Sequence, residues 1–173
     1  EFLPQLYAGN PFTGLEGEIM RFSKEEVMQY VKETDVKFIR LAFCDVYGKQ
    51  KNVAIMPGEL SRAFADGIAM DASSIAGFGG AVRSDLLLRP DPATLTALPW
   101  RPQSGRVVHM FCDIFYPDGR PFEADTRRVL KEAVAAAEAE GLQFSIGAEI
   151  EFYLFKLDEN GEPTREPYDR AGY

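Results

Sequence analysis

Residues 36–56, VKFIRLAFCDVYGKQKNVAIM, contain two strand-like runs around a turn. The first run, 36–46, and the second, 52–56, are rich in the β-branched and aromatic residues that favour strands. Between them, Tyr47-Gly48-Lys49 supplies the turn. The stretch therefore predicts a β-hairpin.

Helices are predicted on both sides of this hairpin. Ser23 and Glu26 have the spacing of a capping box, which predicts a helix that begins there and ends before Asp35. Pro57 opens a second, short helix, and Gly67 suits the left-handed position beyond its last turn. The residues expected to face inward from the two helices are Val27, Tyr30, Val31, Leu60, Ala63 and Phe64.

The chain then passes through a loop and two further strands. Residues 70–80, MDASSIAGFGG, have the small-residue composition of a loop. Strands are predicted for 85–89 and 106–116, and a Pro117-Asp118-Gly119 turn ends the second of them.

The pattern changes after Pro117. A long helix is predicted for 125–140, ended by Gly141, and a last strand for 143–157. The apolar stripe of the helix consists of Leu130, Ala133, Val134 and Ala137. Because a single strand at the end of a chain lacks neighbours to cover it, we expect this second unit to continue beyond Tyr173.

The composition is that of a soluble globular protein, with 173 residues of which 46% are hydrophobic and 27% charged. A net charge of −8 repels polyphosphate and anionic lipid, which argues against nucleic acid and membranes as partners. No signal peptide is recognisable, so we expect a cytoplasmic protein. Cys44 and Cys112 are expected to be buried, unpaired thiols.

Residues 1–19 precede Met20 without a sustained helical or strand period. We interpret them as a leader attached to a natural chain that begins at Met20. Asn10-Pro11-Phe12 leaves a second interpretation open, in which the leader is a docking peptide for a peptide-binding partner.

Glu149 and Glu151 are the most informative polar pair. On a strand they would project from one face, with Cα atoms about 6.5 Å apart. Carboxylates on an otherwise apolar strand need cations or hydrogen-bond donors, and Mg²⁺ or Mn²⁺ meets that need. Each carboxylate could serve one ion of a two-metal site. The alternative is an acidic strand face exposed to solvent.

Asp71 is a second candidate, because the small residues around it permit close approach by a ligand or another chain. Ser73 and Ser74 could orient its carboxylate, although a local cap in a simple turn explains it equally. His109 is the only histidine and lies mid-strand, so a histidine triad or zinc cluster cannot form within this chain. The sequence also has no phosphate-binding glycine loop and no CxxC pair.

Four segments together resemble bacterial type-I glutamine synthetases: MDASSIAGF at 70–78, SDLLLRPDP at 84–92, CDIFYPDGRPFEADTRRVLK at 112–131 and GAEIEFYLF at 147–155. Met70 and Ala72 replace the family's usual Phe and Gly. The resemblance implies an α+β fold, with a β-grasp N-terminal domain at 20–120. At 121–173 it implies the helix and first strand of a truncated α/β catalytic domain.

The family phosphorylates the γ-carboxylate of glutamate with ATP as co-substrate, and ammonia displaces the phosphate. The resemblance implies that Glu149 and Glu151 each bind one of two Mg²⁺ or Mn²⁺ ions. It implies that Asp71, with Ser74 in the same loop, binds ammonium and promotes its deprotonation. Family members form homo-oligomeric dodecamers in which this loop completes a neighbour's site. We expect no activity from these 173 residues alone.

Two alternatives stay open. A γ-glutamyl ligase for another amine, such as a polyamine, shares much of this frame. A non-catalytic β-grasp module that presents residues 1–19 to a partner belongs to a different functional class.

Overall fold

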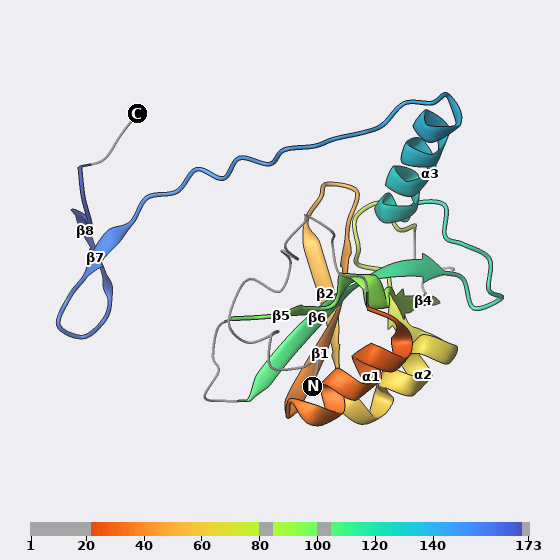
Figure 1. The fold of residues 1–173 in the computed structure, drawn as a ribbon, viewed down its shortest axis with the longest axis horizontal. Helices are drawn as coiled ribbons and strands as arrows, with labels where there is room; N and C mark the ends of the chain where they lie inside the picture. Colours follow the sequence, from red (N-terminus) through yellow and green to blue (C-terminus); the bar gives the residue numbers. More distant parts are fainter. Residues whose placement is uncertain (1–21, 80–84, 100–104, 171–173) are drawn as a thin grey trace. The chain divides into compact units, whose positions relative to one another are not determined.

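The structure is a computed structural model that describes residues 22–79, 85–99 and 105–170 (Figure 1). Its internal contacts divide the chain into a first unit, Glu1–Ala136, and a second unit, Ala137–Tyr173. The leader predicted at 1–19 lies outside the described residues.

Among the described residues of the first unit, six strands form one mixed sheet in the order β2-β1-β6-β4-β3, and β5 pairs with β6. Their bounds are β1 Val36–Cys44, β2 Gln50–Ile55, β3 Ile68–Asp71, β4 Asp85–Pro90, β5 Thr96–Ala97 and β6 Arg106–Phe115. Strands β1 and β6 run parallel, whereas the other neighbours are antiparallel. The long strand β6 therefore lies at the centre of the sheet.

The predicted hairpin is confirmed. Strands β1 and β2 pair in a continuous register from Ile39 opposite Ile55 to Cys44 opposite Gln50. Along β1, Ile39, Leu41 and Phe43 are buried, so one face of the strand packs on the core. The predicted strands at 85–89 and 106–116 are confirmed as β4 and β6.

Both predicted helices of this unit are also confirmed. Helix α1, Lys24–Glu33, has a capping box in which the Glu26 N–H donates to Ser23 Oγ at 3.2 Å and the Ser23 N–H donates to Glu26 Oε2 at 2.7 Å. A 3₁₀ turn, η2 (Pro57–Glu59), leads into helix α2, Leu60–Ala65. Gly67 follows α2 with φ of +87°, the left-handed position expected for it.

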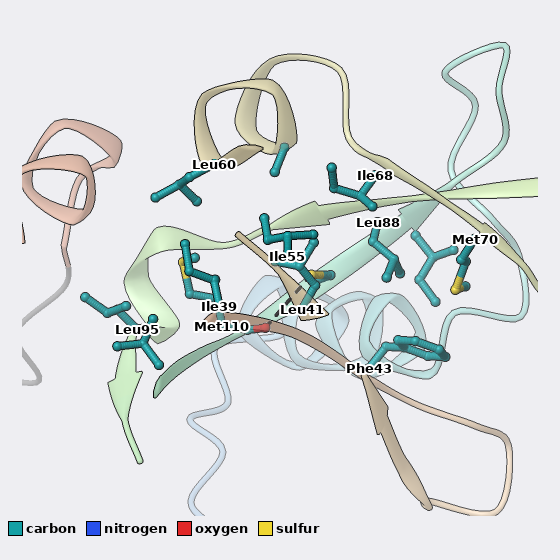
Figure 2. Packing of buried hydrophobic residues seen from close by; sticks show 14 of the residues in the cluster. Ile39, Leu41, Phe43, Ile55, Leu60, Ile68, Met70, Leu88, Leu95 and Met110 are labelled. Carbon is teal, nitrogen blue, oxygen red and sulfur yellow. Dashed lines mark hydrogen bonds between the residues drawn. The ribbon is translucent and has the colours of Figure 1, made fainter. Parts of the chain in front are cut away.

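The core lies between these helices and one face of the sheet. Leu60 of α2, Ile39 and Leu41 of β1 and Met110 of β6 belong to one cluster of buried side chains, which Figure 2 draws as sticks. The predicted inward residues of α1 and α2 belong to this cluster, and Phe64 packs against it while half-buried. Each fully buried leucine side chain contributes about 1.5–3 kcal/mol of hydrophobic stabilisation.

Helix α3, Thr126–Ala139, follows the predicted turn at Pro117-Asp118-Gly119. It ends in a Schellman motif, because the Gly141 N–H donates to the Glu138 carbonyl and the Leu142 N–H to the Ala137 carbonyl, both at 2.9 Å. Of its predicted apolar stripe, Val134 and Ala137 are half-buried, whereas Leu130 and Ala133 are exposed.

Both cysteines are free thiols, but only one is buried. Burial raises the pKa of the Cys112 thiol well above its ordinary value, so this thiol stays protonated at neutral pH. Cys44, the last residue of β1, is half-buried, which corrects the expectation of two buried thiols. In the described ranges, none of the helices has the length and apolar character needed to cross a membrane.

In the second unit, β7 (Phe155–Leu157) and β8 (Pro163–Pro167) form a short antiparallel hairpin. The prediction of a strand over the whole of 143–157 is therefore wrong for 143–154, which Figure 1 draws as an extended segment without strand arrows. A strand needs a hydrogen-bonded neighbour: β8 pairs with residues 155–157, and the Tyr168 N–H donates to the Leu154 carbonyl at 2.8 Å, whereas residues 143–153 have no strand partner among the described residues.

Candidate functional site

Asp71 is the last residue of β3 and not part of a loop, which corrects the prediction for 70–80. Met70 pairs with Leu86 and Asp71 with Asp85, and the Met70 side chain is buried in the core. The Asp71 side chain is exposed, and its Oδ1 accepts the Ser73 N–H at 2.9 Å. The sheet therefore holds this carboxylate at a strand end.

The residues after Asp71, 72–79, form a loop that we call the serine loop. Two turns shape it: the Ile75 N–H donates to the Ala72 carbonyl at 3.0 Å, and the Phe78 N–H to the Ile75 carbonyl at 3.1 Å. Ala72 and Phe78 are buried, whereas Ser73 and Ser74 are exposed. The loop is thus fixed near both ends and presents its hydroxyl groups to solvent.

Aromatic packing holds the far end of the serine loop. The Phe78 ring lies 5.9 Å from that of Phe43 in β1 and 5.1 Å from that of Phe122, measured between centroids. Tyr116 extends the cluster, with its ring 5.5 Å from that of Phe122. Such tilted and edge-on ring pairs add about 0.5–1.5 kcal/mol each beyond their buried area.

The turn of the β1–β2 hairpin packs directly against the serine loop. Gly77 has φ of +79°, and a Cβ atom placed on it would lie only 2.3 Å from Val46 Cγ1. Any larger residue would displace Val46 or the loop. Val46 and the serine loop are therefore packed in contact at Gly77.

Asp45 organises this hairpin turn from a buried position, at 2% exposure. Its Oδ1 accepts the N–H groups of Tyr47 and Lys49, both at 2.9 Å, and its Oδ2 lies 3.5 Å from Lys51 Nζ. Burial alone would raise the pKa of Asp45, but the two N–H groups and the Lys51 ammonium outweigh it and lower the pKa. An aspartate at the start of a turn is a recognisable sequence signal, but the role of Asp45 was not predicted from it.

A second polar cluster, also missed from the sequence, attaches the start of α3 to the sheet. Arg127 forms ion pairs with Asp91 and Asp113, both at 2.5 Å, and Lys131 reaches Asp113 at 2.8 Å. Burial would raise the pKa of Asp91, but the bonds from Arg127 and the Ala93 N–H, together with the charges of Arg127 and Lys131, outweigh it and lower the pKa. The residues of this polar cluster are far apart in the sequence, so no local motif predicts it.

Asp125 contributes a buried carboxylate to the same attachment. It accepts the Ile114 N–H of β6 and the Arg127 N–H of α3, each at 3.0 Å. Burial dominates here and raises the pKa of Asp125. The Asp125 carboxylate thus lies at the positive end of α3, where a negative charge is favourable.

Glu149 and Glu151 lie in the second unit, in the extended segment before β7, and both side chains are exposed. Among the described residues, neither carboxylate takes part in a hydrogen bond or ion pair. Their hard oxygen donors fit Mg²⁺ or Mn²⁺, but Mg²⁺ takes about six oxygen ligands. Within the described ranges no group of three or more His, Cys, Asp or Glu side chains could hold a metal ion. The pair is therefore part of a ligand set at most, and its metal role stays a prediction.

His109 lies in the middle of β6, as expected, with its ring 5.1 Å from that of Phe111 in an edge-on arrangement. It is half-buried within the sheet. Packing of this kind supports a structural role for the histidine.

Comparison with known proteins identifies two adjacent family matches. Residues 35–117 match the family described as glutamine synthetase, beta-Grasp domain, and residues 123–172 match glutamine synthetase, catalytic domain. The division into 20–120 and 121–173 that the sequence analysis made stays a prediction.

Curated relatives include the glutamine synthetase of Clostridium saccharobutylicum, 46% identical over 153 residues, and that of Methanosarcina mazei, 48% identical over 151 residues. These alignments cover 88% and 87% of this chain. The chain spans 34% of the length of each of these relatives.

Solved structures agree on the fold. The Plasmodium falciparum glutamine synthetase matches 70% of this chain and 24% of its own, with a TM-score of 0.62 and 22% identity. A GmaS/ADP complex matches 65% of this chain and 25% of its own, with a TM-score of 0.59 and 25% identity. With its α+β fold, its two family matches and these relatives, the chain belongs to the glutamine synthetase family, as the four resembling segments predicted.

Proposed function

We propose that the whole protein containing these residues is an ATP-dependent glutamate–ammonia ligase that forms glutamine through γ-glutamyl phosphate. The observation that carries the proposal is the identity of 46–48% to glutamine synthetases, which runs through both the β-grasp match and the start of the catalytic match. The exposed Asp71 carboxylate and the exposed Glu149 and Glu151 carboxylates supply the chemistry.

In this proposal Glu149 and Glu151 hold the two divalent ions, one each. Bound Mg²⁺ or Mn²⁺ would neutralise charge on the nucleotide phosphates and on the transferring phosphoryl group. The role of the two glutamates is to hold those ions, which when bound would orient ATP and the γ-carboxylate of glutamate. Phosphoryl transfer depends mainly on such positioning and charge stabilisation.

Asp71 performs the second half of the reaction. Its carboxylate attracts ammonium and accepts one of its protons, which leaves ammonia as the nucleophile. Ammonia attacks the γ-carbonyl carbon, and inorganic phosphate leaves. Ser74, exposed in the same loop, orients the bound ammonium. Because Asp71 ends a strand of the sheet, its backbone is already fixed before ammonium binds.

The assembly and location follow from the same proposal. The whole protein works as a cytoplasmic homo-oligomer, a dodecamer, in which the serine loop of one protomer completes the site of its neighbour. These 173 residues supply one part of that site. The absence of activity in the isolated chain is therefore the expected result.

The test uses the natural full-length protein and measures glutamine formed from glutamate, ammonium and ATP. Glu149→Gln and Glu151→Gln should each lower kcat by more than about 100-fold, because even the outer partners of metal ligands are worth about 10–100-fold. Glu159→Gln, an exposed glutamate in the β7–β8 turn, is the matched control and should keep full activity. Unchanged turnover in the first two variants would remove the metal assignment.

A profile of amines tests the substrate. Ammonium should give the highest kcat/KM, with putrescine and longer polyamines far below it. A preference for a polyamine would replace the proposed reaction by γ-glutamyl ligation to another amine.

A further inference from the structure

We propose that Asp45 is a positioning residue for the Asp71 and Ser74 region, acting through the contact between Val46 and Gly77. The inference rests on the proposed function for its kinetic consequence, and on the described contacts for its structural one. Asp45 acts indirectly in this proposal and does not itself contact substrate.

The first step is the rigidity of the hairpin turn. One oxygen of Asp45 accepts two backbone N–H groups, from Tyr47 and Lys49. The backbone closes the same turn, since the Asp45 N–H donates to the Lys49 carbonyl at 3.1 Å and the Gly48 N–H donates to the Asp45 carbonyl at 3.0 Å. Asp45 is only 2% exposed, so water hardly competes for the hydrogen bonds of its carboxylate. These bonds therefore fix the direction in which the backbone at Val46 leaves β1.

The second step is the contact itself. Val46 lies where a side chain on Gly77 would be, with Cγ1 2.3 Å and Cγ2 2.6 Å from the position of a Cβ atom. A glycine here lets two backbone segments approach more closely than any other residue would. Movement of Val46 is therefore transmitted to Gly77 and from there to the rest of the serine loop.

The third step is the way the serine loop links Gly77 to Asp71: Ile75 packs against the core while half-buried, so the loop moves as a packed segment. Ala72 and Phe78 anchor its ends in the core, but Ser73 and Ser74 between them are exposed. The Ser73 N–H binds Asp71 Oδ1, so the loop and the carboxylate share one hydrogen bond. Displacement of the loop at Gly77 thus alters the surroundings of Asp71.

The second unit supplies a matched control. Asp158 builds the same kind of turn: its Oδ1 accepts the N–H groups of Asn160 and Glu162 at 2.8 and 2.9 Å. Its backbone N–H donates to the Glu162 carbonyl, and the Gly161 N–H donates to the Asp158 carbonyl. Asp158 is exposed, and its turn belongs to the second unit, whereas the serine loop belongs to the first. Asp158→Ala is therefore the control that breaks the same kind of turn without the proposed coupling to the serine loop.

The structural test measures amide hydrogen exchange on the 173-residue chain. Asp45→Ala should speed exchange of the Ile75 and Phe78 N–H groups by about tenfold or more, whereas Asp158→Ala should leave both unchanged. Asp45→Asn keeps the accepting oxygen and should behave like the wild type. If Asp45→Ala fails to fold, Val46→Ala serves as the second variant, because it is a milder change at a half-exposed side chain. It should also speed exchange at Ile75. Faster exchange at Lys49 with no change at Ile75 and Phe78 would overturn the coupling.

The kinetic test uses the full-length protein. Asp45→Ala should raise the KM for ammonium about tenfold and leave the KM for ATP unchanged, since small misplacements of binding groups cost up to about 100-fold. Asp45→Asn should restore the wild-type KM for ammonium, and Asp158→Ala should match the wild type. A variant that merely loses folded protein would lower the rate without changing either KM, and that result would overturn the positioning role. A wild-type protein without ammonium-dependent turnover would refute the proposed function, and the exchange result alone would then decide the coupling.

Discussion

Two hairpins of this chain have the same turn and opposite surroundings. Residues 45–49 in the first unit and 158–162 in the second both place an aspartate at the start and a left-handed glycine, Gly48 or Gly161, fourth. The hydrogen bonds of the two turns correspond one for one. Yet Asp45 is buried whereas Asp158 is exposed.

This difference in burial shows that local sequence determines the hydrogen bonds of a turn, whereas packing determines whether the turn is buried. An Asp-x-x-Gly-x segment favours this turn in both places, because the bonds are made within five residues. Burial depends on the strands that the turn joins. Strand β1 carries Ile39, Leu41 and Phe43 into the core, whereas Phe155 and Leu157 of β7 remain exposed.

The largest expected effect compares one leucine from each hairpin. Leu41→Ala should lower the free energy of unfolding by about 2–5 kcal/mol, because Leu41 is fully buried and its removal leaves a cavity. Leu157→Ala should change it by less than about 0.5 kcal/mol, because that side chain is 63% exposed. Urea unfolding followed by circular dichroism measures both. Equal losses would show that β7 is packed in solution, contrary to the structure.

This contrast also explains which elements could be predicted from the sequence. The capping box at Ser23 and Glu26 and the hairpin at 36–56 act over a few residues, so their patterns were sufficient. The loop predicted for 70–80 wrongly includes Met70 and Asp71, because they stand beside a run of small residues, and only pairing with β4 makes them the end of strand β3. Strand β5, Thr96–Ala97, was missed because two residues carry no period.

The candidate site divides in the same way. Asp71, Ser74, Glu149 and Glu151 were selected from the sequence, and the structure exposes all four side chains. Their supports were not predictable, because the Val46–Gly77 contact joins segments far apart in the chain. The expected strand around Glu149 failed for a related reason, since a strand needs partners that sequence periodicity alone cannot supply.

The next effect tests the contact between the first hairpin and the serine loop. Gly77→Ala should lower the free energy of unfolding by about 2–3 kcal/mol, because a side chain at φ of +79° is strained and also meets Val46. Gly79→Ala, at φ of +92° and with no atom of the described residues within 4 Å of an added Cβ, carries the backbone strain alone and should cost about 1 kcal/mol. Thermal or urea unfolding gives the difference, and equal costs would contradict the close packing of Val46 on Gly77.

A smaller effect compares the two aspartates as pH falls. Hydrogen bonds lower the pKa of both: for Asp158 they come from the Glu162 and Asn160 N–H groups, while for Asp45 they outweigh burial. A carboxyl with a lowered pKa in the folded state stabilises above its unfolded pKa, about 3.9, and this stability is lost as pH falls through the folded pKa. Asp45→Asn should therefore flatten the acid dependence of global unfolding below about pH 4.

Asp158→Asn should leave the same curve unchanged, because Asp158 is exposed in the second unit and its bonds stabilise only a local turn. Urea unfolding midpoints measured between pH 2 and pH 7 distinguish the two variants. A parallel acid slope in wild type and Asp45→Asn would show that Asp45 does not couple to global folding.

The smallest expected effect concerns the proposed metal ligands. Glu149→Gln and Glu151→Gln should change the free energy of unfolding of this chain by less than about 0.5 kcal/mol, since both side chains are exposed. The same substitutions should abolish turnover in the full-length protein. A marked stabilisation of the 173-residue chain by either substitution would indicate charge repulsion with groups that the structure does not place nearby.

The parallel pairing of β1 with β6 has a consequence for synthesis on the ribosome. Val36 pairs with Arg106, so the first hairpin emerges long before the strand that fills the centre of its sheet. At about 5–20 residues per second, several seconds pass with one side of β1 open to other nascent chains. During that interval, β1 is a segment that a chaperone could protect from pairing with other chains.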